Sequence, residues 1–415
     1  MDIAPNRGDV PGAQEGLLVG RWGSTKPPTG EPWRLIVLGD VGLSGGMAER
    51  AVRAGNAGSI WGDLRPVLQA ADMVVANLEC ALLDEWSPEK LFASSAKWAP
   101  DLANVGIDVV HLANNHILDY GPEGMAQTLR AVESAGLTAI GAAHQASDAA
   151  RMVVTESGSL RIGWLAAGHT RLSQPESPRL RELDVASLIE DVRKNRNLVD
   201  LLIVSLHWGK MLVDYPDPEQ FAAGRRLAEA GASAVLMHHA HILQGAEIYK
   251  GVPICYNLGN CIFDPDEGEF QKAKSFRHTK YEDQVTGCVF CLEFQGREFH
   301  RLLAVPFELP RKDCPDGQDR EGLVWACPAE AQRILSRLQR ISDDLTGDFE
   351  PLYTQQISEV RRQALRLHLS LIFRGGQVGR IGYLLREVRW AHMAIIAAWV
   401  WRAVWPFTKT KKAGR

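Results

Sequence analysis

Five short polar clusters dominate this chain, and each directly follows an apolar run that is typical of a β-strand. Carboxylate oxygens, amide oxygens and neutral imidazoles are the ligands that Mn, Fe, Zn and Mg ions take in proteins. Strand ends are where a rigid sheet can direct such side chains toward one point. The pattern therefore predicts one metal site. The clusters are Gly39-Asp40, Asn77-Leu78-Glu79, Asn114-Asn115-His116-Ile117-Leu118-Asp119, His207-Trp208-Gly209 and His238-His239-Ala240-His241.

Three histidines within four positions make the last cluster the most unusual one. Burying a polar group without a partner costs on the order of 1 to 3 kcal/mol, so packing alone does not account for the grouping. On a strand, His239 and His241 would share one face and His238 would lie on the other. We therefore expect His239 and His241 to be the metal ligands.

The elements that carry these clusters alternate between strands and helices, which predicts an α/β fold. A later segment, 285–305, is typical of a β-hairpin around Gln295-Gly296, so the sheet system is expected to be mixed. The expected strands are 33–38, 73–76, 109–113, 137–140, 162–166, 201–206, 234–237 and 254–256. The expected helices include 121–135, 185–195 and 218–231.

Composition indicates a cytoplasmic protein. Residues 1–32 are rich in Gly, Pro and charge and lack the apolar stretch of a secretory signal, so we expect a flexible N-terminal arm. The seven cysteines are an odd number scattered through apolar runs, which argues against a disulfide framework. Cys288 and Cys291 form a C-x-x-C inside a strand-like run, and we expect them to be buried in packing.

The composition changes beyond residue 310. Residues 311–375 read as a linker and a helical extension, with helical periodicity at 329–345 and 355–373. Residues 376–415 form a basic, Trp-rich tail. From 361 onward twelve Lys or Arg and one acid give a charge of +11, which leaves −15 on residues 1–360.

The apolar stretch 390–401 in this tail would span about 18 Å as a helix, well short of the roughly 30 Å of a bilayer core. Its tryptophans and flanking basic residues suit the inner membrane surface. Docking on the protein or on a second subunit is an equally good interpretation. The tail lacks a nucleic-acid-reading fold and the body is acidic, so no nucleic-acid partner is expected.

In their order along the chain, the motifs resemble those of the CapA (PGA_cap) family. That family is associated with bacterial capsule and poly-γ-glutamate synthesis, and it is similar in fold to calcineurin-like metallophosphoesterases. The resemblance covers roughly residues 33–264, and we expect the domain to run over 33–310. The motifs that carry it are Gly39-Asp40, Asn77-Leu78-Glu79, Ala113-Asn114-Asn115-His116 with Asp119-Tyr120-Gly121, Leu206-His207-Trp208-Gly209, His238-His239-Ala240-His241 with Gln244-Gly245-Ala246-Glu247, and Tyr256-Asn257-Leu258-Gly259-Asn260.

The resemblance implies a four-layer α/β/β/α metallophosphoesterase-like sandwich, followed by the C-terminal helical extension. It implies one or two divalent metal ions at the sheet ends, with Glu79 bridging them. It also implies that His116 is the general acid or base and that Asp119 anchors its ring. The implied metal ligands are Asp40, Glu79, Asn115, His207, His239 and His241.

One departure from the metallophosphoesterase pattern affects the first metal. Those proteins usually begin with Asp-x-His, whereas this chain has Asp40-Val41-Gly42, so one ligand is missing. His238 or His169 could replace it. One metal, two metals or none are therefore open, with one or two favoured.

Further polar and aromatic residues flank the expected centre. His111 lies inside an apolar run and is expected in the core or behind a ligand, while His144 follows a small-residue loop that borders the active site in relatives. The expected substrate contacts are Asn77, Asn114, His144, His169, Trp208, His238, Asn257 and Asn260.

The leading hypothesis is a metal-dependent hydrolase of the CapA type. It would act on a phosphoester or on a γ-glutamyl or other amide bond, in the synthesis, release or trimming of a capsule-like polymer or a related small molecule. The alternative is a non-catalytic assembly or partner-binding protein that docks on the inner membrane face through its tail.

Overall fold

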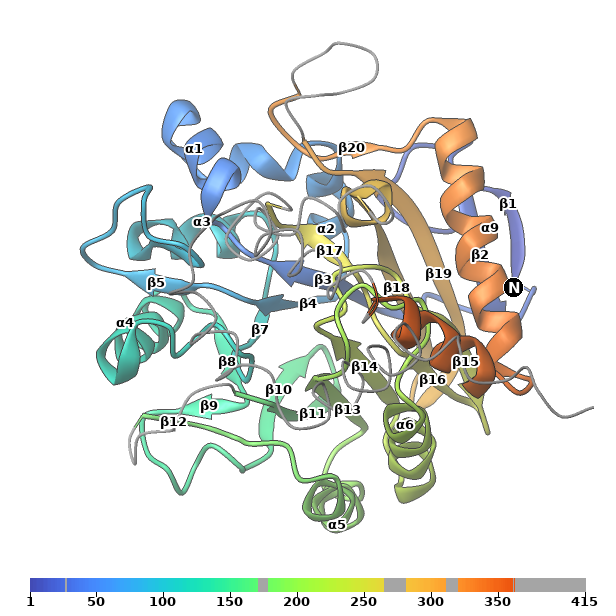
Figure 1. Cartoon of the computed structure of the whole chain (residues 1–415). Coiled ribbons are helices and arrows are strands. Elements are labelled where there is room, and N and C mark those ends of the chain that lie inside the picture. The colour runs from blue at the N-terminus through green and yellow to red at the C-terminus, as the bar shows by residue number, and fades with distance from the viewer. Residues whose placement is uncertain (27, 171–177, 265–280, 311–319, 361, 363–415) are drawn as a thin grey trace, which may run out of the picture. The chain divides into compact units, whose positions relative to one another are not determined.

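The computed structural model describes residues 1–26, 28–170, 178–264, 281–310, 320–360 and 362. The chain divides into two compact units, Met1–Ile357 and Ser358–Arg415. The fold described below is that of the first unit (Figure 1).

A ten-stranded mixed sheet forms one half of the unit. Its order is β1-β2-β19-β18-β3-β4-β7-β8, with β17 paired to β3 and β20 paired to β19. Strands β3, β4, β7 and β8 run parallel, whereas β1, β2, β18 and β19 pair in antiparallel fashion. The bounds are β1 Asp2–Pro5, β2 Leu18–Gly23, β3 Trp33–Val41, β4 Met73–Leu78, β7 Val109–His111, β8 Thr138–Ile140, β17 Asn260–Ile262, β18 Thr286–Gln295, β19 Glu298–Glu308 and β20 Val324–Trp325.

A six-stranded sheet forms the other half, in the order β10-β11-β13-β14-β16-β15. Its central strands β11, β13, β14 and β16 are parallel. The bounds are β10 Val153–Ser157, β11 Leu160–Gly168, β13 Leu201–His207, β14 Ala234–His238, β15 Ala246–Tyr249 and β16 Val252–Cys255. Two small two-stranded sheets pair β5 Ala81–Leu83 with β6 Ala93–Ser95 and β9 Ala142–Ala143 with β12 Arg179–Leu180.

Three hydrophobic cores separate four layers. The first packs helices against the ten-stranded sheet, as Leu129 and Ile36 illustrate. The second joins the two sheets through residues such as Leu35 and Ile203. The third packs helices against the six-stranded sheet, with Leu227 among its members. The α/β/β/α order that the resemblance implies is therefore present (Figure 1).

The helices are on the outside because each has one apolar face. The outer helices on the ten-stranded sheet are α1 Gly45–Ala54, η1 Gly58–Leu64, α2 Arg65–Gln69, η2 Ala96–Trp98, α3 Ala99–Asn104 and α4 Gly121–Ser134. On the six-stranded sheet they are α5 Val185–Asn195 and α6 Pro218–Ala230. Local sequence sets the ends of α6: Asp217 and Gln220 form a capping box, and Gly231 ends the helix at φ 115°.

The expected strands and helices of the central domain are all present, including the hairpin of β18 and β19. Cys288 and Cys291 are buried within β18, as expected. Burial raises the pKa of both thiols above the ordinary value.

The expectation of a flexible arm at residues 1–32 is wrong. Strand β2 pairs with β19, and β1 pairs with β2, so the segment completes the ten-stranded sheet. Val10 and Val19 are buried, and Asp9 forms ion pairs with Arg21 and Arg301. The Gly-, Pro- and charge-rich composition suggested a flexible arm, and the strand that pairs with β2 lies far away in the sequence.

The C-terminal extension begins as part of the same unit. Helix α9, Pro328–Leu345, contributes Leu335 and Leu338 to the core between the sheets and Ile341 to the outer core. A further helical stretch covers 350–360. The tail 376–415 lies outside the described residues. Within the described residues, no helix has the length and apolar character needed to cross a membrane.

Candidate metal centre

Two rows of polar residues face each other where the parallel strands of the two sheets end. Strand register aligns the members of each row. In the ten-stranded sheet the row is Asn260, Asp40, Asn77 and His111, on β17, β3, β4 and β7. In the six-stranded sheet it is His207 and His238, on β13 and β14, with Gly168 of β11 aligned beside His207.

The rows meet across the seam between the sheets. The amide nitrogen of Asn77 donates to Oδ1 of Asp40 at 2.8 Å and lies 3.1 Å from Nδ1 of His207. Nδ1 of His238 lies 3.5 Å from Oδ1 of Asp40. All four side chains are buried. The predicted strand-end clusters therefore converge on one place.

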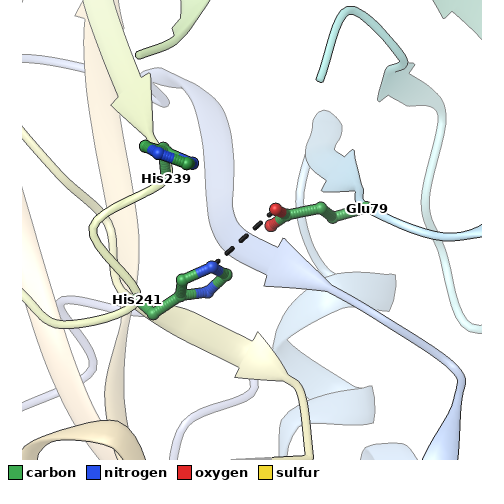
Figure 2. A group of neighbouring side chains, drawn as sticks. All are labelled: Glu79, His239 and His241. Atoms are coloured by element: carbon green, nitrogen blue, oxygen red, sulfur yellow. Dashed lines mark ion pairs between the residues drawn. The ribbon is translucent and has the colours of Figure 1, made fainter. Parts of the chain in front are cut away.

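Glu79, which follows β4, lies at the middle of this convergence. Its Oε1 is 3.4 Å from Nε2 of His207, 3.8 Å from Nε2 of His241 and 4.0 Å from Nε2 of His116. Glu79 belongs to two groups whose donor atoms lie within 4.8 Å of one another, one with His239 and His241 and one with Asp40 and His207. Figure 2 shows the carboxylate of Glu79 facing the rings of His239 and His241.

The donor spacing around His207 suits a divalent cation. Nε2 of His207 lies 2.7 Å from Oδ1 of Asn115 and 3.0 Å from Nδ1 of His239. Ligand bonds of about 2.1 Å at right angles place neighbouring donor atoms about 3 Å apart. Among the described residues, the buried Oδ2 of Asp40 accepts no hydrogen bond, which leaves a carboxylate oxygen for a cation. The donor set therefore fits divalent metal ions.

His239 and His241 reach Glu79 by a different route from the expected one. Strand β14 ends at His238, and φ is 104° at His239 and 57° at His241. Side-chain alternation along a strand therefore does not orient them, and that part of the prediction is wrong. Left-handed backbone in bulky residues is strained and is often found at functional sites.

A neighbouring amide fixes the ring of His241. The amide nitrogen of Asn260 donates to the carbonyl of Gln284 at 3.0 Å, so its Oδ1 must face Nδ1 of His241, 2.9 Å away. Nδ1 of His241 then carries the proton. Its Nε2 lone pair is directed toward Glu79, as a metal ligand requires.

His116 has the geometry of a proton donor or acceptor beside the centre. Its Nδ1 donates to Oδ2 of Asp119 at 2.7 Å, which is the anchoring contact expected from the sequence. Phe92 stacks on the ring, with centroids 3.8 Å apart and planes at 20°. The turn is held by Asn114, whose Oδ1 accepts from the backbone amides of His116 and Ile117.

Burial and neighbouring charge set the protonation of the buried groups. Burial raises the pKa of Asp40, but His238 and His241 outweigh it, so the net pKa lies below the ordinary value. Burial and then the nearby histidines hold the pKa of His207 well below normal. Mainly because of burial, the pKa of His111 is lowered to about 3. The imidazoles of His111 and His207 are therefore neutral, which for His207 is what metal coordination needs.

His111 sits behind the ligands, as expected. Its Nε2 donates to the carbonyl of Ala113 at 3.0 Å, so its Nδ1 accepts from the hydroxyl of Ser205 at 2.6 Å. Because Ser205 belongs to β13 and His111 to β7, this pair ties the two sheets together directly below the centre.

Five of the expected substrate contacts are buried supports of the centre. Asn77 and Asn114 bond to each other, Asn260 orients His241, and Oδ1 of Asn257 accepts from the amide of Gly259 in a turn. His238 faces Asp40. All five are buried in the described structure, and their contact with a substrate stays a prediction. They are Asn77, Asn114, His238, Asn257 and Asn260.

The other three expected contacts are more exposed. His169 pairs with Glu182 at 3.1 Å, and its ring meets Trp208 edge-on at 6.0 Å, so both border the strand end that carries His207. His144 pairs with Glu133 of α4 at 3.2 Å.

Gly42, in place of the usual first-motif histidine, lies under a phenyl ring. A Cβ at Gly42 would come within 3.0 Å of Phe263, whose ring also lies 4.5 Å from that of His241. Of the two proposed replacements, His238 lies beside Asp40, whereas His169 is exposed. Neither Phe92 nor Phe263 was predicted from the sequence. Only Phe263, close after the Asn257–Asn260 motif, carried a positional signal.

Comparison with known proteins gives one family match. The family described as bacterial capsule synthesis protein PGA_cap matches residues 34–265. The chain is 29% identical over 251 residues to the capsule biosynthesis protein CapA of Bacillus anthracis, over 56% of this chain and 60% of that protein. It is 27% identical over 237 residues to the PGA biosynthesis protein CapA of Bacillus subtilis (strain 168), over 55% and 62%.

A probable polyglutamine synthesis accessory protein of Mycobacterium tuberculosis is 31% identical over 227 residues, or 49% of this chain and 59% of that protein. The matches thus span about three fifths of these relatives' length. Among solved structures, a phosphatase from Mycoplasma pneumoniae is similar with a TM-score of 0.43 at 16% identity, over 66% of this chain and 93% of that chain. The calcineurin-like phosphoesterase YfkN of Bacillus subtilis has a TM-score of 0.39 at 12% identity, over 76% and 99%.

Proposed function

This chain belongs to the PGA_cap family of bacterial capsule synthesis proteins, and on that premise we propose that it is a metal-dependent hydrolase acting on a capsule polymer of the poly-γ-glutamate kind. The observation that carries the proposal is the position of Glu79, one carboxylate shared by two groups of metal-ligating side chains. The bond cleaved would be a phosphoester or a γ-glutamyl or other amide bond.

The residues at the centre divide naturally between two cations. Glu79 would serve both. Asp40 and His207 would complete a first site, with Asn115 beside His207, and His239 and His241 would complete a second. Bound there, a divalent cation supplies Lewis acidity and lowers the pKa of a water toward neutrality.

His116 is the residue placed to move a proton. Its Nδ1 is committed to Asp119, so Nε2, on the side facing Glu79, is the atom that exchanges a proton with the leaving group. The stack on Phe92 holds the ring plane. A positioned imidazole of this kind contributes about 10²- to 10⁴-fold to rate.

Metal content and hydrolysis together test the proposal. Protein purified without chelators or added metal should contain a divalent metal, measured by plasma mass spectrometry. It should hydrolyse an aryl phosphate, a γ-glutamyl anilide or poly-γ-glutamate. His116→Ala should keep the metal and lose hydrolysis, whereas His239→Ala should lose both.

The control is His300→Ala, a histidine outside the centre that bonds to the carbonyl of Lys26. It should behave as wild type. Protein without metal, or equal turnover in wild type, His116→Ala and His239→Ala, would refute a metal-dependent hydrolase.

The alternative is an assembly protein on the cytoplasmic membrane face, and Gly42 favours it. Phe263 occupies the space in which a first-motif histidine would lie, which weakens the first site. The basic tail, with eight Lys or Arg and one acid over 376–415, would supply attraction to anionic lipid. Flotation with phosphatidylglycerol vesicles, comparing the full chain with one ending at residue 375, distinguishes the two. If the protein is an assembly factor, the chain that ends at residue 375 should no longer bind the vesicles. If it is a soluble enzyme, that shorter chain should keep its hydrolytic turnover.

A further inference from the structure

One guanidinium of the C-terminal extension joins two loops at the metal centre. Arg337 of α9 donates through Nη1 to the carbonyl of Leu243 at 2.8 Å and through Nη2 to Oδ1 of Asp214 at 2.5 Å. Its Nε lies 3.3 Å from Oδ2 of Asp283. The side chain is only 13% exposed. Arg337 thus uses its fork to fix three separate segments.

Two of these segments continue directly from proposed metal ligands. Leu243 lies two residues after His241, and Asp214 lies in the loop that leaves His207. The loops are also bonded to each other, because the amide of Leu212 donates to the carbonyl of Ala240 at 2.9 Å. Ala240 is the residue between His239 and His241.

More bonds reinforce the same junction. The side-chain nitrogen of Gln244 donates to the carbonyls of Val213 at 2.8 Å and Tyr215 at 3.1 Å. On the other side of the loop, Gln356 accepts from the amide of Asp214 at 2.9 Å and donates to its Oδ2 at 2.7 Å. The carboxylate of Asp214 is thus held by Arg337 of α9 and by Gln356 together.

The backbone explains why such bracing is needed. His239 and His241 both have positive φ, and strained conformations persist only when their surroundings determine them fully. We propose that Arg337 is a positioning residue for His239 and His241, holding loop 239–243 in the conformation that presents both imidazoles to Glu79. The inference rests on the proposed metal centre.

The test measures metal affinity, with a matched control on the same helix. Arg337→Gln removes the fork. Arg333→Gln removes a guanidinium one turn earlier that pairs with Glu330 and Asp283 and reaches neither loop. Mn²⁺ binding is followed by calorimetry and by competition with a chelator. We expect Arg337→Gln to weaken binding about 10- to 100-fold, as loss of an outer support typically does, and Arg333→Gln to stay within about threefold of wild type.

Two further measurements separate positioning from simple stabilisation. Arg337→Lys keeps the charge but cannot span Leu243 and Asp214, so it should also weaken Mn²⁺ binding and remains available if the glutamine variant does not fold. Amide hydrogen exchange of metal-free protein should show faster exchange in 239–246 for the Arg337 variants and no change for Arg333→Gln.

The possible outcomes distinguish the proposed role of Arg337 from the proposed hydrolase function. Melting temperatures lowered in the Arg337 variants with unchanged Mn²⁺ affinity would show a purely structural role and overturn the inference alone. Wild-type protein that binds Mn²⁺ without hydrolysing any substrate would overturn the proposed function, while the affinity comparison would still decide on Arg337. Wild-type protein that binds no Mn²⁺ would overturn both.

Discussion

Asn260 is the residue on which the ring of His241 depends, because its Oδ1 accepts the Nδ1 proton and leaves Nε2 for a metal ion. We predict that Asn260→Ala weakens metal binding about 10- to 100-fold. Asn260→Asp keeps an acceptor at the same place and should retain most of the affinity. Calorimetric titration with Mn²⁺ checks both variants. Equal affinity for the alanine variant and wild type would show that Asp40, 3.3 Å from the same nitrogen, is a sufficient acceptor.

His111 should make stability depend on pH. Its pKa is about 3 in the folded state against about 6.5 in the unfolded chain, so the unfolded state binds a proton first as the pH falls. The stabilisation from neutral His111 is complete above pH 6.5 and is lost progressively toward pH 3. The slope is about 1.4 kcal/mol per pH unit.

Urea unfolding in the presence of chelator tests this between pH 7 and 5. His111→Gln can still accept from Ser205 and donate to Ala113, but it does not titrate. Its free energy of unfolding should therefore fall less than that of wild type, by about 2 kcal/mol over this interval. Parallel pH curves for the two proteins would contradict the assignment.

At the scale of elements, β11 and the end of β7 approach too closely for any side chain at Gly168. A Cβ there would lie 1.7 Å from the carbonyl oxygen of Ala113 and 3.2 Å from Cβ of His207. We predict that Gly168→Ala lowers the free energy of unfolding by at least about 1 to 3 kcal/mol, the usual cost of overpacking, and also weakens metal binding. Thermal and urea unfolding measure the first effect. Gly30→Ala, with nothing within 4 Å, is the control and should be neutral.

The sequence was sufficient to predict the strands and the place where they end. Asp40, Glu79 and His207 each close or follow a strand in an α/β pattern, and carboxyl ends of parallel strands meet at one edge. The orientation of His239 and His241 could not be predicted, because it comes from two left-handed residues rather than from strand periodicity. Phe92 could not be found either, since only the folded loop brings it onto His116.

At the scale of the whole molecule, the N-terminal segment with strands β1 and β2 is part of the folded core. Val10, Val19 and Trp22 are buried, and burial of each such side chain is worth roughly 1.5 to 3 kcal/mol. Because domains are stable by only about 5 to 15 kcal/mol, we predict that deleting residues 1–23 abolishes the cooperative thermal transition seen by circular dichroism. Asp9→Asn removes only the ion pairs with Arg21 and Arg301 and should still melt cooperatively. A deletion variant that melts like wild type would show that strands β1 and β2 are not needed for the stability of the fold.

The pairing of β2 with β19 could not be predicted from the sequence alone. Strand β2 shows no strict apolar alternation, its partner lies beyond residue 297, and only the folded sheet reveals the pairing. Helix α9 is similar: its periodicity was predicted, whereas its place against both sheets was not.

The two facing rows of polar side chains have a kinetic consequence. Asp40 and Glu79 come from one sheet and His207 from the other, with His239 and His241 following β14 of that second sheet. A chain in which only one sheet has formed has only some of the metal ligands in place. A bound ion therefore stabilises the native state more than a folding transition state in which the two sheets have not yet docked. Divalent cations should then lengthen the lifetime of the native protein while leaving its refolding speed almost unaltered.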